Sequence, residues 1–298
     1  MLTKLSDLHQ MAKAAARKKL VLAAAHDQNA LEAVINASKN KIVDVILVGN
    51  KSVITEISEK SGLDISGFEI IDEPDNDKAA AISVKMVSEK RADIVMKGHL
   101  GTSSLLKAVL NKEWGLRSGE LLSHLALFEV PVYHKIIALT DAAMNIAPDF
   151  KGKASILKNA VNYLRKLGIE KPKVAVLSAV ETVNPDMKSA MEAAALAKMG
   201  DRGQFGSCII DGPFAFDNAV SKKSAELKKI TSPVAGDADL IMGDDLDASN
   251  AIYKTFIYFA SAKCAAVIVG ATAPIVLTSR ADSDETKLNS IALAAAVN

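Results

Sequence analysis

The sequence contains very little cysteine and no long apolar segment. Its only two cysteines among 298 residues, Cys208 and Cys264, both stand inside apolar runs, so we expect buried free thiols rather than a disulfide framework. No apolar stretch reaches the ~18 residues that a membrane span requires. The charged N-terminal segment also lacks the uninterrupted apolar core of a signal peptide. These absences predict a cytoplasmic protein without a membrane partner.

An excess of one charge is also missing, and aromatic residues are scarce. Lysine and arginine together number 36 and aspartate and glutamate 35, which leaves a formal net charge of +1. A protein without a strong positive field has no general attraction for nucleic acid, so we expect no nucleic-acid partner. Hydrophobic residues make up 49% of the chain and aromatic residues only 4%. This composition is typical of an α/β enzyme whose core is built from Ala, Val, Ile and Leu.

Several motifs of cofactor and metal sites are absent too. No G-x-G-x-x-G follows the first predicted strand, no cysteine–histidine cluster has zinc spacing, and no G-x-S-x-G elbow occurs. The acidic segment 236–247 also fails as a calcium loop, because no Gly stands sixth and no Glu twelfth when counting starts at Asp245. We therefore predict no metal and no bound cofactor, and we expect Asp245 or Asp247 to cap a helix.

The chain does contain a regular alternation of short β-branched runs with longer segments of helical periodicity. The predicted strands cover residues 20–25, 43–48, 68–71, 93–96, 135–139, 174–178, 207–211, 239–242, 265–270 and 275–277. This alternation predicts an α/β fold of mostly parallel sheet with flanking helices. An irregular stretch at 139–149 and a return of the last strand indicate two lobes with a cleft between them. We predict a first domain of residues 1–139 plus 276–298 and a second of residues 140–275.

The strongest site signal is the turn after the last predicted strand, where Ser279 and Arg280 precede a helical pattern. The amino end of a helix carries partial positive charge, and the arginine fork matches phosphate oxygens. Ser279 and Arg280 are therefore predicted to hold a phosphate group. Asp282, Ser283 and Asp284 follow in the first helical turn, and Asp282 or Ser283 is also a candidate for the N-cap.

A second turn of this kind spans residues 96–104, M-K-G-H-L-G-T-S-S, after another predicted strand. Its glycines allow close backbone approach, its hydroxyl residues crowd the start of a helix, and its lysine adds charge. It is not a Walker A loop, because no G-K-[ST] closes it. The candidate phosphate ligands are Lys97, Gly98, His99, Gly101, Thr102, Ser103 and Ser104. His99 is also a candidate electrophile or base, and its alternative role is to stabilise the turn.

Two further residues are candidates for binding substrate. Arg117, in W-G-L-R-S-G-E, can add charge to the rim of the site, and a solvated surface arginine is the alternative. Asp211, in I-I-D-G-P, is expected to end a strand and face the predicted cleft, with Pro213 starting a helix.

The ordered motifs of the chain resemble the phosphate acetyl/butyryltransferase family over nearly the whole length. They are M-K-G-H-L-G-T-S-S at 96–104, T-D-A-A-M-N at 140–145, I-D-G-P-F-A-F-D at 210–217, A-D-L-I-M-G-D-D-L-D-A-S-N-A-I-Y-K at 238–254 and T-S-R-A-D-S at 278–283. The compact length and the last motif are more similar to the butyryl branch than to the acetyl branch. The resemblance implies a two-lobed fold like that of isocitrate and isopropylmalate dehydrogenases.

The resemblance also implies the chemistry, an acyl exchange between coenzyme A and phosphate. Acyl-CoA, phosphate and acyl phosphate are then the partners, and coenzyme A is a substrate rather than a cofactor. Ser279 and Arg280 match the family's serine–arginine pair, which helps to hold the acyl phosphate. The acetyl branch has a catalytic Asp seven positions after that serine, where this chain has Thr286. The base that deprotonates the thiol stays open between Asp284, Asp282, Glu285 and His99.

A direct attack of the thiol in a ternary complex is expected, because neither cysteine stands in an exposed, electropositive turn. Ser279 is the expected donor to the tetrahedral oxyanion. The sequence leaves open a phosphate acetyltransferase, an acyl-carrier-protein phosphate acyltransferase and a non-catalytic acyl-CoA binding protein. A metal-dependent hydroxyacid dehydrogenase of related fold would need a convergent Asp set and a nucleotide pocket, and we find neither in the sequence. We also expect a homo-oligomer, at least a dimer.

Overall fold

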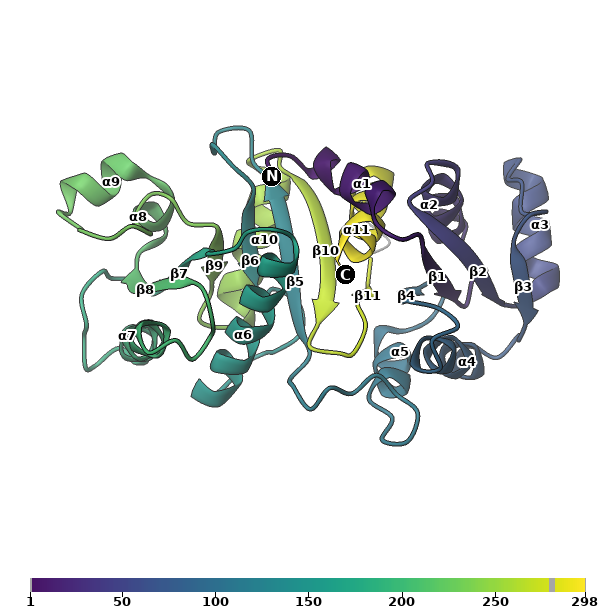
Figure 1. Cartoon of the computed structure of the whole chain (residues 1–298), viewed down its shortest axis with the longest axis horizontal. Helices are drawn as coiled ribbons and strands as arrows, with labels where there is room; N and C mark the ends of the chain where they lie inside the picture. The colour runs from purple at the N-terminus through teal and green to yellow at the C-terminus, as the bar shows by residue number, and fades with distance from the viewer. Residues whose placement is uncertain (1, 279–281, 298) are drawn as a thin grey trace. The chain divides into compact units, whose positions relative to one another are not determined.

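The computed structural model describes residues 2–278 and 282–297, and it divides into two compact units. The terminal unit comprises Ser6–Glu120 and Ala265–Asn298, and the central unit comprises Met1–Leu5 and Leu121–Cys264. Figure 1 shows the elements of both units along the chain.

The terminal unit is a sheet with the strand order β3-β2-β1-β4-β11-β10. Its strands are β1 (Lys18–Ala23), β2 (Val43–Gly49), β3 (Glu69–Asp72), β4 (Ile94–Lys97), β10 (Lys263–Val269) and β11 (Ile275–Val276). Its helices are α1 (Leu5–Ala14), α2 (Gln28–Lys39), α3 (Lys51–Ser61), α4 (Asn76–Ser88), α5 (Thr102–Val109) and α11 (Asp284–Ala296). The pairs are parallel except β10–β11, which is antiparallel.

The central unit is a sheet with the strand order β5-β6-β9-β7-β8. Its strands are β5 (Ser123–Glu129), β6 (Ile137–Thr140), β7 (Lys173–Leu177), β8 (Ile209–Phe214) and β9 (Leu240–Met242). Its helices are α6 (Phe150–Lys166), α7 (Lys188–Asp201), α8 (Phe216–Val220), α9 (Lys222–Leu227) and α10 (Leu246–Tyr258). Here β5–β6 is antiparallel and the other pairs are parallel.

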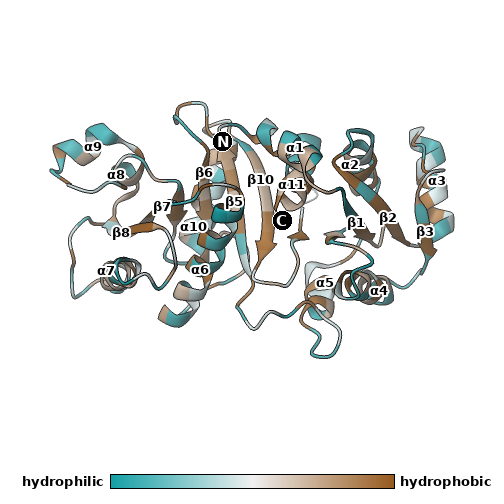
Figure 2. Ribbon diagram, viewed as in Figure 1, coloured by the Kyte–Doolittle hydropathy of each residue, from teal (hydrophilic) through white to brown (hydrophobic). Residues whose placement is uncertain are grey.

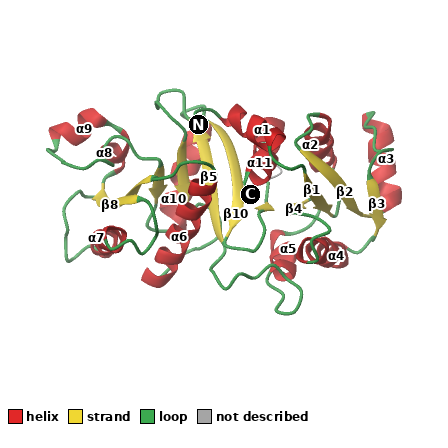
Figure 3. Cartoon of the chain, viewed as in Figure 1, coloured by secondary structure: helices red, strands yellow, loops and turns green. Residues whose placement is uncertain are grey.

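The prediction of an α/β fold with mostly parallel sheet is confirmed. The central strands of each sheet are buried, as in the run from Leu20 to Ala23 and in all of β6 and β9, and their hydrophobic residues stand out in Figure 2. Helices alternate with strands along most of the chain, which Figure 3 shows by colour. Strands covered on both faces read as continuous apolar runs, and this is why their sequences predict them.

Strand β5 is missing from the sequence prediction. It pairs antiparallel with β6, with Leu127 opposite Ala138, and only residues 130–136 separate the two strands. An antiparallel pair needs no helical crossover, so the alternation of strands with helical segments does not reveal it. Because β5 and β6 pair, both belong to the central unit. The contacts change units at Glu120–Leu121 and Cys264–Ala265, whereas the sequence places the boundaries at 139–140 and 275–276, and that assignment stays a prediction.

The expected strand end at Asp211 is wrong. Strand β8 continues through Gly212 and Pro213 to Phe214, and the next helix begins at Phe216 rather than at Pro213. Proline lacks the N–H that a ladder needs, but it is tolerated at the edge of a sheet. Since β8 is the last strand in the order of its sheet, Pro213 can stand inside it.

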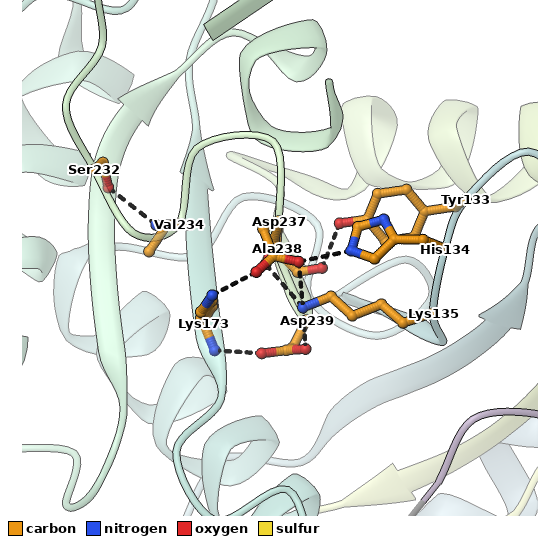
Figure 4. Close-up of polar contacts among 9 residues, drawn as sticks. All are labelled: Tyr133, His134, Lys135, Lys173, Ser232, Val234, Asp237, Ala238 and Asp239. Carbon is orange, nitrogen blue, oxygen red and sulfur yellow. Dashed lines mark hydrogen bonds and ion pairs between the residues drawn. The ribbon is translucent and has the colours of Figure 1, made fainter. Parts of the chain in front are cut away.

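A cluster of charged side chains links the amino ends of β6, β7 and β9 in the central unit (Figure 4). The Asp237 carboxylate lies 2.7 Å from His134 Nε2, 3.0 Å from Lys135 Nζ and in contact with Lys173 Nζ. Nearby, Asp239 pairs with Lys135 and accepts the backbone N–H of Lys173. Burial alone raises the pKa of Asp237, but the hydrogen bonds from Lys173, His134 and Lys135 outweigh it and hold the pKa well below its usual range.

Asp237→Asn is expected to reduce the free energy of unfolding at neutral pH by about 1.5–3 kcal/mol, as for hydrogen bonds to a charged group. The folded-state pKa of Asp237 is depressed, so its stabilisation is present above the unfolded pKa near ~3.9 and is lost as the pH falls further. Urea unfolding from pH 7 down to pH 3 measures both effects, and the difference between the two proteins should begin to shrink as the pH falls below ~3.9. Asp201→Asn, in the exposed pair with Lys198, is the control and should change stability much less. A constant difference between wild type and Asp237→Asn at all pH values would contradict this.

Candidate phosphate site

Three strands of the terminal unit end side by side, and two of them, β4 and β11, lead into the predicted phosphate turns. Strand β4 pairs parallel with β1 on one side, with Ala23 opposite Lys97, and with β11 on the other, with Val276 opposite Met96. The turns that follow β4 and β11 are therefore neighbours at one edge of the sheet. Ligands of open α/β sheets bind at this carboxyl edge, and the expectation that both turns stand at strand carboxyl ends is confirmed.

Backbone hydrogen bonds hold the β4–α5 turn close to the end of β1. The N–H groups of Gly98 and His99 donate to the carbonyls of Ala23 and Ala24, both at 2.8 Å. A Cβ at Gly98 would lie 2.3 Å from the Ala24 carbonyl oxygen, so only glycine allows this approach. The Lys97 ammonium lies 3.4 Å from the carbonyl oxygens of Gly98 and Leu100, within the turn.

Helix α5 begins without a side-chain cap. Its N-cap residue is Gly101, which has no side chain to bond to the first turn of this helix. Thr102 and Ser103 are exposed there, and Ser104 is half-buried. An uncapped helix start with exposed hydroxyls offers N–H and O–H donors to an anion.

Two histidines stand beside this turn. The rings of His26 and His99 are 5.2 Å apart, and His99 Nδ1 lies 4.0 Å from an Asp27 carboxylate oxygen. Asn76 donates to the His99 carbonyl at 2.9 Å. Burial and the neighbouring His99 lower the pKa of His26, although Asn76 and Asp27 oppose them. His26 is thus favoured in its neutral form, whereas His99, with its side chain 49% exposed, is accessible to a ligand.

The β11–α11 turn is described only in part, because Ser279 and Arg280 lie outside the described residues. Thr278 before it is buried. Ser283 is the N-cap of α11 and accepts the N–H of Thr286 at 3.1 Å, so of the two candidate caps Ser283 is confirmed. The Asp284 side chain is 74% exposed and lies 3.6 Å from Lys287 Nζ, Glu285 is exposed and Asp282 is half-buried.

Two further candidates belong to other segments of the chain. Arg117 is exposed and its backbone bridges Ala271, in the connection that precedes β11, whereas the phosphate turn follows β11. Asp211 belongs to β8 of the central unit, where its carboxylate accepts the N–H of Gly212 at 2.8 Å. Roles for Arg117 and Asp211 in binding substrate stay predictions.

Comparisons with known proteins identify the family of the chain. The family described as "Phosphate acetyl/butaryl transferase" matches residues 4–82 and 74–295. A phosphate butyryltransferase of Clostridium beijerinckii is 49% identical over 94% of this chain and 93% of its own. The chain belongs to this family. A branched-chain phosphotransacylase from Enterococcus faecalis has a similar structure, with a TM-score of 0.83, 33% identity, and coverage of 93% of this chain and 97% of its own.

The fold of the family extends to a group of dehydrogenases. A 4-hydroxythreonine-4-phosphate dehydrogenase from Klebsiella pneumoniae has a TM-score of 0.60 at 11% identity, covering 94% of this chain and 98% of its own. At this identity the likeness concerns the fold alone, and it agrees with the expected dehydrogenase-like architecture. Among the described residues, no group of three or more His, Cys, Asp or Glu side chains is arranged to hold a metal ion. Within the same residues, no helix is long and apolar enough to cross a membrane.

Two motifs that carry the family resemblance form a polar edge of the central unit, where the sequence analysis names no site residue. T-D-A-A-M-N follows β6 and G-D-D-L-D follows the neighbouring β9, with Thr140 opposite Met242. Asn250 links the two segments by donating to the Ala142 carbonyl at 2.9 Å. The carboxylate of Asp141 is buried and accepts the N–H groups of two residues of its own turn. The position of both motifs directly after predicted strands was the sequence signal that could have drawn attention to this edge.

The same edge contains a buried lysine. Lys153 of α6 bonds to Glu192 at 2.6 Å and to Asp244. Burial lowers the pKa of Lys153, but these hydrogen bonds outweigh it and raise the pKa. The neighbouring Asp245 caps α10 by accepting the N–H of Ala248 at 2.8 Å, as the sequence predicts. The acidic segment therefore fixes the start of α10 and the position of α6.

Proposed function

We propose that the chain is a phosphate butyryltransferase, which converts butyryl-CoA and phosphate to butyryl phosphate and coenzyme A. The observation that carries this proposal is the pair of neighbouring turns after β4 and β11, in a chain of the phosphate acyltransferase family. Two donor-rich turns at one sheet edge suit a phosphate group. The identity to a named phosphate butyryltransferase supports butyryl as the acyl group.

In the direction that consumes acyl phosphate, the thiolate of coenzyme A attacks the acyl carbonyl. A tetrahedral oxyanion forms, the carbon–oxygen bond to phosphate breaks, and phosphate leaves. Arg280 and the β4–α5 turn are the proposed ligands of the phosphate, and Ser279 is the proposed donor to the oxyanion. A carboxylate of the α11 start or His99 takes the thiol proton.

Transfer is proposed to be direct, without an acylated cysteine. Cys264 is buried, and burial raises the pKa of the Cys208 thiol against the opposing charges of Arg165 and Lys171. A nucleophilic cysteine needs the opposite environment, in which the thiolate is stabilised. The structure therefore supports attack by the thiol of coenzyme A itself in a ternary complex.

The proposed function predicts that the purified protein releases free thiol from butyryl-CoA only when phosphate is present, and that a chelator leaves the rate unchanged. A thiol-reactive dye measures the release, and a panel of acetyl-, propionyl-, butyryl- and branched acyl-CoAs measures the acyl preference. Equal release without phosphate would indicate a thioesterase, and binding without release would indicate a non-catalytic protein. A clear preference for acetyl-CoA would favour the acetyltransferase alternative.

Oligomeric state and compartment stay predictions. We propose a cytoplasmic homo-oligomer, at least a dimer. An apolar groove of about 420 Å³ in the central unit is lined by Val132, Tyr133, Phe216 and Phe256, among others. Val132 is 92% exposed, and Phe259, which adjoins the groove residue Ala260, is 88% exposed. Exposed apolar patches of this kind mark contact surfaces, so this is where we expect a second copy of the chain to bind.

A further inference from the structure

His99 of the β4–α5 turn is held by residues from the end of β1 and the start of α4. Its backbone N–H donates to the Ala24 carbonyl at 2.8 Å, and its carbonyl accepts the Asn76 side chain at 2.9 Å. Its ring lies 5.2 Å from the ring of His26, and its Nδ1 lies 4.0 Å from Asp27 Oδ2. The backbone of His99 is therefore fixed on both sides, and its ring has two polar neighbours.

This cluster contains two buried polar atoms without a partner. His26 Nδ1 and Asn76 Oδ1 are both buried, and neither has a hydrogen-bond partner within residues 2–278 and 282–297. A buried polar atom that lacks a hydrogen bond lowers the stability of the fold. The cluster is thus not arranged for stability, and such local departures are typical of functional sites.

Asp27 is placed to orient the ring of His99. Its Oδ1 caps α2 by accepting the N–H of Ala30 at 2.9 Å, so the carboxylate has a fixed direction, and its Oδ2 is the oxygen nearest to His99 Nδ1. At 4.0 Å the two atoms are not hydrogen-bonded, but contacts of this kind often tighten when substrate binds. A carboxylate beside Nδ1 favours the tautomer with its proton on that nitrogen, which leaves Nε2 as the acceptor.

The acceptor nitrogen of His99 complements the donors of the same turn. The His99 side chain is half-exposed, and α5 begins three residues later, at Thr102. The N–H groups of a helix start suit the charged oxygens of a phosphate group. Inorganic phosphate at neutral pH also keeps a hydroxyl group, which needs an acceptor. One acceptor nitrogen beside a row of donors therefore matches hydrogen phosphate.

We propose that Asp27 is a positioning residue for His99, which keeps the proton on Nδ1 and directs Nε2 to the hydroxyl of hydrogen phosphate at the β4–α5 turn. The proposal rests on the proposed function and deepens it. His99 then serves as a ligand of phosphate, whichever group deprotonates the thiol. Asp27 contributes to phosphate affinity through His99 and not to the binding of butyryl-CoA.

The test replaces Asp27 with Asn, which caps a helix as well as Asp does but carries no charge. When its single amide oxygen accepts the N–H of Ala30, its NH₂ group faces His99 and favours the opposite tautomer. We expect KM for phosphate to rise at least fivefold, while KM for butyryl-CoA stays within about twofold. Asp75→Asn is the matched control, because Asp75 caps α4 in the same way by accepting the N–H of Lys78 at 2.9 Å, and both KM values should stay within about twofold.

Two further readouts distinguish a positioning role from a structural one. In a His99→Ala background, Asp27→Asn should change KM for phosphate by less than about twofold, because the group it acts through is already gone. The ¹⁵N chemical shifts of labelled histidines, assigned with His99→Ala, should place the proton of neutral His99 on Nδ1 in wild type and on Nε2 in Asp27→Asn. Independent, multiplying effects of the two substitutions would overturn the proposal, as would a proton on Nε2 in wild type.

The outcomes also separate this proposal from the proposed function. Inorganic phosphate should raise the Tm of wild type, because a ligand that binds only the folded state stabilises it, and the shift should be smaller in Asp27→Asn. A phosphate-dependent Tm shift without thiol release would reject the function, and the size of the shift in Asp27→Asn would still decide the role of Asp27. Equal KM for phosphate and equal Tm shifts in wild type and Asp27→Asn would overturn that role alone. If Asp27→Asn and Asp27→Ser, which can both cap α2, unfold at the assay temperature, Asp27 is a structural residue and the proposal is wrong.

Discussion

Arg280→Ala is expected to lower kcat/KM for phosphate-dependent acyl transfer by at least tenfold, and by up to about a hundredfold. A guanidinium offers two parallel hydrogen bonds to phosphate oxygens, and a hydrogen bond to a charged group contributes roughly 1.5–3 kcal/mol. One decade in rate corresponds to ~1.4 kcal/mol. Steady-state kinetics with phosphate as the varied substrate measures the effect, together with the Tm of each variant.

Arg91→Ala is the matched control for Arg280→Ala. Arg91 is an arginine of the same unit with its side chain 55% exposed, and it precedes β4, at the opposite end of the strand from the predicted phosphate turn. Its variant should therefore keep kcat/KM within about twofold. Near-normal efficiency of Arg280→Ala would remove that residue from the site, and a collapsed Tm would make its role structural.

The second large effect concerns the base that deprotonates the thiol. We predict that the amide variant of one carboxylate at the start of α11 loses turnover and keeps substrate affinity, as expected for a group that acts in the transition state. The predicted order is Asp284, then Asp282, then Glu285, with His99 fourth. The structure places Asp284 close to Lys287, so its variant also reports on that pair.

The measurement is kcat against pH for Asp284→Asn, Asp282→Asn and Glu285→Gln, each compared with wild type. Loss of the acidic limb of the profile in one variant would identify the base. If all three variants stay within about threefold of wild type, a barrier difference below ~1 kcal/mol, the base is not in this turn. His99, which is half-exposed beside the β4–α5 turn, or direct proton transfer to phosphate would then be the leading candidates.

Sequence reasoning could identify the features that depend on neighbours along the chain. The apolar runs gave most of the strands, because a strand buried on both faces has no polar side to interrupt it. Capping is also local, and the predicted roles of Asp245 and Ser283 are confirmed. The glycine of the β4–α5 turn was found as well, since only a residue without Cβ fits beside the Ala24 carbonyl.

The tertiary structure alone decided the features that depend on distant residues. Strand β5 exists because β6 pairs with it antiparallel, and Pro213 can lie in β8 because that strand is at the edge of its sheet. The packing around Lys153 and Lys287 determines their burial. The identity of these residues as lysines does not predict it. Local pattern therefore determined most of the elements and where the predicted phosphate turns begin, whereas packing between segments far apart decided the remaining strand pairing and which charges are buried.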